Sequence, residues 1–346
     1  MVSCYQTEGG TAIINQKEIA ERAGVSRATV SRAFTQNANV SPKTLAKIQS
    51  AMVSLGLEPI AWLPGGERRR VRYVLVIAGD ISNHFYSQII RGICDQLASL
   101  GIMTAVCNSN YDSQTEEEQI QFANANNYLG IIMVTAIERP TLSEALKKSK
   151  VPIVFVNRYI HSVDTDVVCI DNYMGGYMAA TYLTENGHRR VGYVATYKGS
   201  TPQEDRIKGF AAALHDQRIT LERYKIFYGK SSVLRGKQTG EEFAAQGMPY
   251  TALFVADALV AVGIANSLRA QGLRIPEDVS ILCFDDSPYI DESGLDLSTI
   301  RYDPYSMGQT TANTLIQRMN TPDNDVHHIY LVPKLVERKS VRNLTI

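Results

Sequence analysis

Long apolar runs are absent from this chain of 346 residues. No stretch approaches the roughly 18 consecutive apolar residues that a membrane-spanning helix requires. The first dozen residues have neither the basic segment nor the long apolar segment of a secretory signal, and we expect them to form a tail without regular structure. These absences predict a cytoplasmic protein with no membrane partner.

Cysteine is scarce and shows no pairing pattern. The five cysteines are odd in number and widely spaced, and none stands in a C-x-x-C pair that would suggest a zinc or redox site. We therefore expect free, mostly buried thiols, no metal site and no cofactor. The cysteines are Cys4, Cys94, Cys107, Cys169 and Cys283.

The motifs of common enzyme classes are also missing, including G-x-x-x-x-G-K-[ST], G-x-G-x-x-G, G-x-S-x-G and H-E-x-x-H. The adjacent His327 and His328 lie in an expected strand, where their side chains would point to opposite faces and form a poor metal pair. We predict no catalytic residue and no enzyme activity. Acid–base chemistry by carboxylates in a cleft is the alternative.

Charge is divided unevenly along the chain. The formal net charge is zero, but residues 1–72 contain ten Lys and Arg against five Asp and Glu. The remaining residues contain 25 basic side chains against 30 acidic ones. A basic head on an acidic body indicates that only the head meets a polyanion such as DNA.

Three short helical patterns follow one another in the basic head, which we assign to residues 13–58. Ser26 and Ser41 are favourable N-caps for the second and third helices. Residues 23–26, Ala-Gly-Val-Ser, form the short glycine-containing turn typical of a helix-turn-helix. The pattern predicts a small all-α DNA-binding unit, and an ordinary helical bundle with solvated arginines is the alternative.

The second helix presents a basic, hydroxyl-bearing face that suits the major groove, which is about 12 Å wide. Arginine can bond guanine through two hydrogen bonds and an alanine methyl can contact the thymine methyl, so we assign to base edges Arg27, Ala28 and Arg32. Hydroxyl and ammonium groups suit phosphate oxygens, so we assign to the DNA backbone Thr29, Ser31 and Lys43.

From residue 73 onward, short β-branched apolar runs alternate with longer helical patterns. Continuous apolar runs are typical of parallel strands covered on both faces, and the alternation predicts repeated βαβ units. About ten strands are too many for one small domain, so we expect two sheets that face each other across a cleft. The clearest strands are expected at residues 73–78, 103–106, 130–134, 152–156, 167–170, 191–195, 252–255 and 281–284.

Polar and aromatic side chains follow these expected strands, where ligands bind in open α/β sheets. Carboxylates, amides, arginines and aromatic rings suit a small molecule rich in hydroxyl groups. Each residue also has a structural alternative: Asp171 and Asp257 as helix N-caps, Asp285 and Asp286 as turn formers, and Phe85 as core. The candidates are residues 80–86, Asn157, Arg158, Asp171, residues 200–206, Asp257, Asp285 and Asp286.

Residues 17–32 and 39–44 resemble the head of the lactose-repressor (LacI/GalR) family of bacterial transcription regulators. The likeness extends over about residues 14–341. It implies a helix-turn-helix head followed by a two-lobed α/β domain like that of periplasmic sugar-binding proteins. The implied lobes are residues 73–171 with 303–330, and residues 172–302 with 331–346.

The resemblance implies a ligand-responsive regulator, in the first place a repressor, that binds a pseudo-palindromic operator in double-stranded DNA as a homodimer. In that family the positions of Arg206 and Asp285 are the most dependable effector contacts, and Phe85 and Tyr86 match contacts in the first loop. The less consistent cleft positions are Asn157, Arg158, Asp171 and Asp257.

Two further positions bear on the effector. At Ser200 and Ser231 the family's purine-binding member has an Arg and an aromatic residue, so a sugar, sugar acid or sugar phosphate is expected here.

The linker, residues 59–72, departs from the family's hinge helix, because Pro64 and two glycines oppose a helix. A sugar-binding receptor without sequence-specific DNA binding is therefore the alternative function.

Overall fold

The structure is a computed structural model that describes residues 4–7, 10–13, 16–34, 40–55, 72–219, 224–322 and 324–345. The chain forms two compact units, Met1–Val71 and Arg72–Ile346. The linker residues 59–71, with Pro64, lie outside the described part, and the domain limits assigned above stay predictions. No helix of the part described is long and apolar enough to cross a membrane.

The first unit opens with a short antiparallel hairpin of β1 (Cys4–Thr7) and β2 (Gly10–Ile13). Its register pairs Cys4 with Ile13 and Thr7 with Gly10. The expectation of a tail without regular structure was therefore wrong. The segment contains β-branched and aromatic residues, and these residue types favour strands.

Three helices follow the hairpin: α1 (Gln16–Ala23), α2 (Arg27–Ala33) and α3 (Pro42–Ser54). The Ser26 side chain accepts the Thr29 N–H at 3.1 Å, and the Ser41 side chain accepts the Thr44 N–H at 3.3 Å. Both predicted N-caps are confirmed. Apolar side chains from all three helices close one small core, formed by Ile19, Ala20, Ala23, Val30, Ala33, Leu45, Ile48, Ala51 and Met52.

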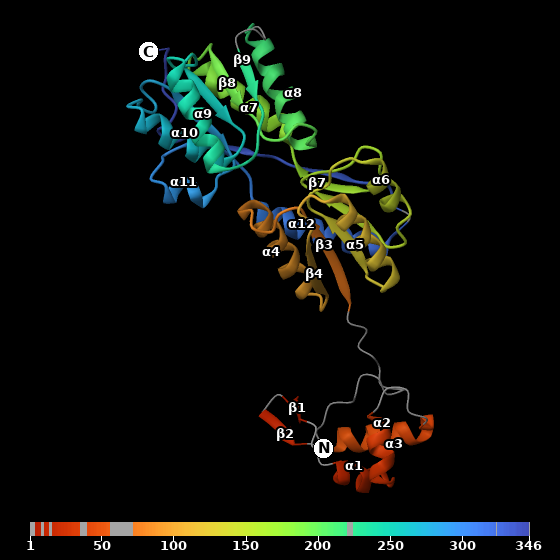
Figure 1. Cartoon of the computed structure of the whole chain (residues 1–346). Coiled ribbons are helices and arrows are strands. Elements are labelled where there is room, and N and C mark those ends of the chain that lie inside the picture. The colour runs from red at the N-terminus through yellow and green to blue at the C-terminus, as the bar shows by residue number, and fades with distance from the viewer. Residues whose placement is uncertain are drawn as a thin grey trace. The chain divides into compact units, whose positions relative to one another are not determined.

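The second unit contains two lobes, each built on a six-stranded sheet (Figure 1). The first lobe has the all-parallel order β13-β7-β6-β5-β3-β4. Its strands are β3 (Tyr73–Ala78), β4 (Met103–Asn108), β5 (Gly130–Met133), β6 (Ile153–Val156), β7 (Asp166–Ile170) and β13 (His328–Leu331). Its helices are α4 (His84–Ala98), α5 (Ser113–Ala125), α6 (Pro140–Lys147) and α12 (Pro304–Asn320).

The second lobe has the order β14-β12-β11-β10-β8-β9, in which only the β12–β14 pair is antiparallel. Its strands are β8 (Val191–Val194), β9 (Tyr224–Phe227), β10 (Ala252–Val255), β11 (Ser280–Phe284), β12 (Ser298–Arg301) and β14 (Lys334–Val336). Its helices are α7 (Asn172–Glu185), α8 (Thr201–Asp216), α9 (Val233–Ala245), α10 (Ala258–Ala270) and α11 (Pro288–Glu292). The predicted fold class, an all-α head and a two-lobed α/β body, is confirmed.

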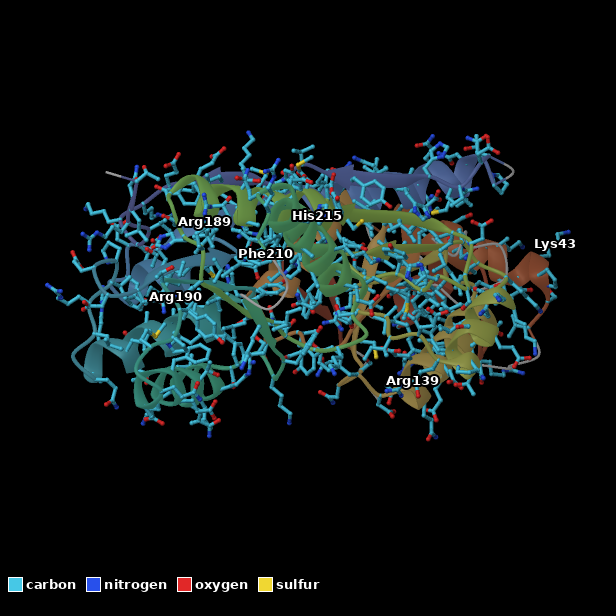
Figure 2. The ribbon with its side chains drawn as sticks, turned by 90° about the horizontal axis from the view of Figure 1, so that it is seen from above. Lys43, Arg139, Arg189, Arg190, Phe210 and His215 are labelled. Atoms are coloured by element: carbon cyan, nitrogen blue, oxygen red, sulfur yellow. The ribbon has the colours of Figure 1, made fainter. Side chains whose placement is uncertain are left out.

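Strand membership shows that the chain passes between the lobes three times, after β7, after β12 and after β13. One buried apolar cluster contains residues of both lobes, and each lobe also buries a further cluster of its own. In the second lobe, Phe210 of α8 lies inside and stacks on Tyr193 and Phe254, with ring centroids 5.1 and 5.3 Å away (Figure 2). These rings fix α8 against the sheet.

Three helix pairs pack through reciprocal glycines, one on each helix. At each of these glycines an added Cβ would overlap a backbone carbonyl oxygen of the partner helix. The helices can approach this closely only because the glycines carry no side chain. The pairs are Gly92 and Gly308 for α4 and α12, Gly176 and Gly209 for α7 and α8, and Gly236 and Gly263 for α9 and α10.

A buried carboxyl group lies in the first lobe, at the start of α5. Glu116 is 3% exposed and accepts a hydrogen bond from the Ser109 hydroxyl at 3.0 Å. Burial raises the pKa of Glu116 to about 7, although Ser109 and Arg139 act in the opposite direction. The native state therefore holds this proton more tightly than the unfolded chain does.

Replacing Glu116 by Gln tests how much stability is lost when this buried carboxyl group ionises. Stability that depends on protonated Glu116 is complete below pH 4.5 and is lost as the pH rises through about 7, by up to roughly 3 kcal/mol. We expect Glu116→Gln to raise the melting temperature at pH 8 and to change it little at pH 4.5. The control is Glu118→Gln, an exposed residue of the same helix. Identical pH profiles for the two variants would contradict the assignment.

Candidate functional site

The second helix of the head presents its polar side to solvent. Arg27, Ala28, Ser31 and Arg32 are exposed, while the helix buries Val30 and Ala33 on the opposite side. The face predicted to contact DNA is therefore free of the head's own core, and its contacts stay predictions.

Two of the residues assigned to the DNA backbone differ in whether their polar groups already take part in the structure of the head. The Thr29 hydroxyl is half-buried and bonds the Ser26 hydroxyl at 2.8 Å. Lys43 is exposed in the first turn of α3 (Figure 2). The Lys43 ammonium is therefore freer to follow a phosphate than the Thr29 hydroxyl, which already completes a helix cap.

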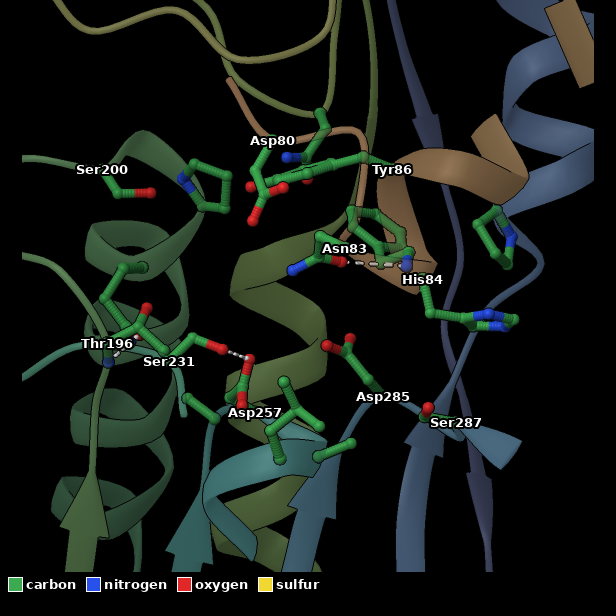
Figure 3. Close-up of a pocket in the computed structure, with 18 of the residues that line it drawn as sticks. Asp80, Asn83, His84, Tyr86, Thr196, Ser200, Ser231, Asp257, Asp285 and Ser287 are labelled. Atoms are coloured by element: carbon green, nitrogen blue, oxygen red, sulfur yellow. Dashed lines mark hydrogen bonds between the residues drawn. The ribbon is translucent and has the colours of Figure 1, made fainter. Parts of the chain in front are cut away.

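A cavity of about 260 Å³ lies between the two lobes (Figure 3). Residues that follow β3, β6, β8, β10 and β11 line it, so it lies beyond the carboxyl ends of strands from both sheets. Seven of the eight predicted effector contacts line this cavity: Phe85, Tyr86, Asn157, Arg158, Arg206, Asp257 and Asp285.

Arg206 of α8 is 8% exposed and is held by the second lobe. Its Nε donates to Asn172 Oδ1 at 2.8 Å, and its Nη1 donates to the Ala256 carbonyl at 3.1 Å. The guanidinium lies 3.6 Å from the centre of the Phe284 ring, which is a close cation–π contact. The side chain is thus fixed before any ligand arrives.

Asp285 follows β11 with a φ of 81°, a left-handed conformation that is strained for a residue with a side chain. The Tyr302 hydroxyl donates to its Oδ1. Burial raises the pKa of Asp285 to about 6, although Arg206 and the bond from Tyr302 act in the opposite direction. At neutral pH the cavity floor therefore carries a buried carboxylate beside a buried guanidinium.

Asp257 caps a helix and also lines the cavity. Its Oδ1 accepts the Val260 N–H at 3.1 Å as the N-cap of α10, and its Oδ2 accepts the Ser231 hydroxyl at 2.6 Å (Figure 3). The cap holds the carboxylate at the wall of the cavity. Ser231 shares that wall.

The first lobe contributes aromatic rings and a second arginine. The Arg158 guanidinium lies 5.8 Å from the centre of the Tyr111 ring. Phe85 packs edge-on against Tyr302 of the other lobe at 5.3 Å. Asn157 adopts a φ of 68°, a second strained position at the cavity.

Asp171 does not line the cavity. Its Oδ1 accepts the Met174 N–H at 2.8 Å and caps α7, the structural role that the sequence left open for it. The free N–H groups of the helix account for this carboxylate without a ligand.

Several lining residues were not among the candidates predicted from the sequence. Tyr111 follows β4, Thr196 and Tyr197 follow β8, and Tyr302 follows the short strand β12. Aromatic residues after strands are a usable signal for Tyr111 and Tyr197. Tyr302 required knowledge of β12, which has only four residues.

Two family models match the chain. The model for bacterial regulatory proteins of the lacI family matches residues 15–59, and the model for a periplasmic binding protein-like domain matches residues 180–341. The transcriptional regulator DegA of Bacillus subtilis is 27% identical over 94% of this chain and 98% of its own length. The transcriptional repressor CytR of Escherichia coli is 28% identical over 88% of this chain and 89% of its own length.

Solved structures agree with the fold. A LacI family regulator from Enterococcus faecium with bound ribose is 26% identical, has a TM-score of 0.71, and is covered completely by 79% of this chain. The lac repressor dimer bound to operator is 23% identical with a TM-score of 0.74, over 95% of this chain and 99% of that one. With the matches to head and body, these likenesses show that the chain belongs to the LacI family of bacterial regulatory proteins, which are DNA-binding regulators of transcription.

Proposed function

We propose that this protein is a repressor that binds a pseudo-palindromic operator as a homodimer and is switched by a sugar or sugar derivative in the cavity. The observation that carries this proposal is the fixed pair of Arg206 and Asp285 at the floor of a cavity between two lobes. The ribose held by the Enterococcus faecium regulator supports a sugar. DNA binding places the protein in the cytoplasm, on the nucleoid.

The head supplies sequence reading through Arg27, Ala28 and Arg32. A single head of this kind contacts only a few base pairs, so useful specificity needs two heads on two half-sites. That requirement is the reason for a homodimer. The proposed domains are the head at residues 13–58, the linker at 59–72 and the two lobes assigned from the sequence.

The effector would act by changing how the lobes meet. Three aromatic contacts join the lobes beside the cavity: His84 with Tyr289 at 5.8 Å, Tyr111 with Tyr197 at 6.4 Å, and the Phe85–Tyr302 contact described above. All six residues line the cavity, so a ligand that contacts both walls favours the closed arrangement. A ligand shifts DNA affinity only through its different affinities for the two arrangements, typically by about 1–3 kcal/mol.

Two substitutions in the head separate base reading from phosphate binding. Arg32→Ala should weaken binding to DNA from upstream of the protein's own gene by about 10- to 100-fold, with little effect on scrambled DNA. Lys43→Ala should weaken binding to both DNAs equally and lower the salt slope by about one. Fluorescence anisotropy at several salt concentrations measures both. No sequence preference in the wild-type protein would favour the alternative, a sugar receptor without specific DNA binding.

Substitutions in the cavity test the switch. With a panel of neutral sugars, sugar acids and sugar phosphates, one compound should change the operator affinity of the wild-type protein by about 5- to 150-fold. Asp285→Asn should abolish that change and leave ligand-free operator binding intact, because the amide keeps an oxygen that accepts the Tyr302 hydroxyl and the residue does not lie in the head. Asp171→Asn, which keeps a capping oxygen outside the cavity, is the matched control. The same loss in that control would contradict the assignment.

A further inference from the structure

Carboxylates outnumber guanidinium groups in the lining of the cavity. In Figure 3 the carboxylates of Asp80, Asp257 and Asp285 point toward one space, from loops of both lobes. Four aspartates and two arginines line it: Asp80, Asp257, Asp285, Asp286, Arg158 and Arg206.

One of the four carboxylates is neutralised from outside. Asp286 forms an ion pair with Arg338 at 2.8 Å and lies 3.9 Å from the Arg301 guanidinium. The other three carboxylates accept hydrogen bonds from hydroxyl or backbone groups, namely Ser82 on Asp80, Ser231 on Asp257 and Tyr302 on Asp285. Hydrogen bonds to neutral groups stabilise these negative charges without cancelling them.

Each of the two arginines already acts on a carboxyl group of the protein. Arg206 donates one N–H from Nε to Asn172 and one from Nη1 to Ala256. The charge of Arg206 also faces the carboxylate of Asp285, whose pKa it lowers. Arg158 is buried, its guanidinium lies 5.8 Å from the centre of the Tyr111 ring, and its charge lowers the pKa of the buried Glu116. Lys198 lies near this end of the lobe but is not a lining residue, and its ammonium lies 5.0 Å from the centre of the Tyr228 ring.

Helix N-termini are the other usual source of anion binding, and side chains cap two of those at the cavity. Asn83 Oδ1 accepts the Phe85 N–H at 2.9 Å at the start of α4, and Asp257 caps α10. The start of α8 has no side-chain cap, and Pro202 removes one of its free N–H groups. A phosphate or carboxylate in the cavity would therefore meet one uncapped helix start and more carboxylates than guanidinium groups.

We propose that the cavity selects an uncharged, polyhydroxylated effector and excludes its phosphorylated and carboxylated forms. The inference rests on the proposed sugar-responsive function and narrows it to one class of compound. Hydroxyl groups satisfy the free oxygens of Asp80 and Asp285 as donors and satisfy the remaining Arg206 N–H groups as acceptors. An added negative charge would instead face carboxylates in a partly desolvated site, where repulsion is strong.

Matched pairs of compounds test the charge selection on the full-length protein. Isothermal titration would compare ribose with ribose 5-phosphate, glucose with glucose 6-phosphate and gluconate, and galactose with galactose 1-phosphate, at pH 7.5. At least one neutral sugar should bind, and its charged counterpart should bind about 100-fold or more weakly. A charged member that binds as tightly as its neutral partner would overturn the proposal and leave the sugar-responsive function standing.

An isosteric variant connects the selection to one residue. Asp80→Asn removes a negative charge and keeps the oxygen that accepts the Ser82 N–H and hydroxyl. This variant should reduce the ratio between the affinities for the neutral and the charged sugar by about tenfold. Asp171→Asn, outside the cavity, should leave that ratio unchanged. An equal ratio in both variants contradicts the role of Asp80. If no compound of either charge binds, the proposed sugar function fails together with this inference, whereas operator binding is measured separately.

Discussion

The burial of one charge, the guanidinium of Arg206, constrains how the second lobe can be assembled. A buried cation is costly unless its N–H groups find acceptors. Here the acceptors are Asn172, the first residue of α7, and the carbonyl of Ala256, directly after β10. The face of Phe284, the last residue of β11, lies beneath the charge. One side chain therefore relates α7, α8, β10 and β11 to one another, and the cavity lies where they meet.

The backbone of Arg206 is positioned by a second constraint, the close approach of α7 and α8. A Cβ at Gly176 would overlap the Arg206 carbonyl, and a Cβ at Gly209 would overlap the Tyr173 carbonyl. The same reciprocal arrangement joins α9 to α10 and α4 to α12, two pairs whose helices also begin at the cavity. The glycines thus act on the site without touching it, because they set where the cavity-facing ends of the helices lie.

Local signals explain what the sequence could predict. Ser26, Ser41 and Asp257 cap helices by bonding backbone N–H groups two or three residues away, so short windows contain both partners. β9, β12 and β14 contain charged residues and lack the continuous apolar run of the central strands, and α12 has a Thr- and Gln-rich sequence without a strong apolar stripe. These elements form because they pack against neighbouring strands and helices from distant parts of the chain. A short window of sequence does not contain those partners.

The site shows the same division. Asp171 and Asp257 both follow a strand and precede a helix, and the sequence offered a cap and a ligand contact for each. Only the packing of the lobes brings Asp257 to the cavity and leaves Asp171 outside it. Tyr302 was missed because its partner, Asp285, lies 17 residues away on another strand. A residue's chemistry is readable locally, whereas the space that it faces is a property of the fold.

Charge separation along the chain also limits how such a regulator can work. The head, within residues 1–72, carries an excess of five positive charges and the rest an excess of five negative charges, so the head supplies the attraction to DNA and the body opposes it. An uncharged effector leaves both of these long-range contributions unchanged. In the proposed homodimer, such an effector can then alter DNA affinity only by changing the arrangement of the lobes and, through it, the placement of the two heads. On this proposal, electrostatics sets the strength of binding to any DNA, and the geometry of the cavity determines whether that binding is switched.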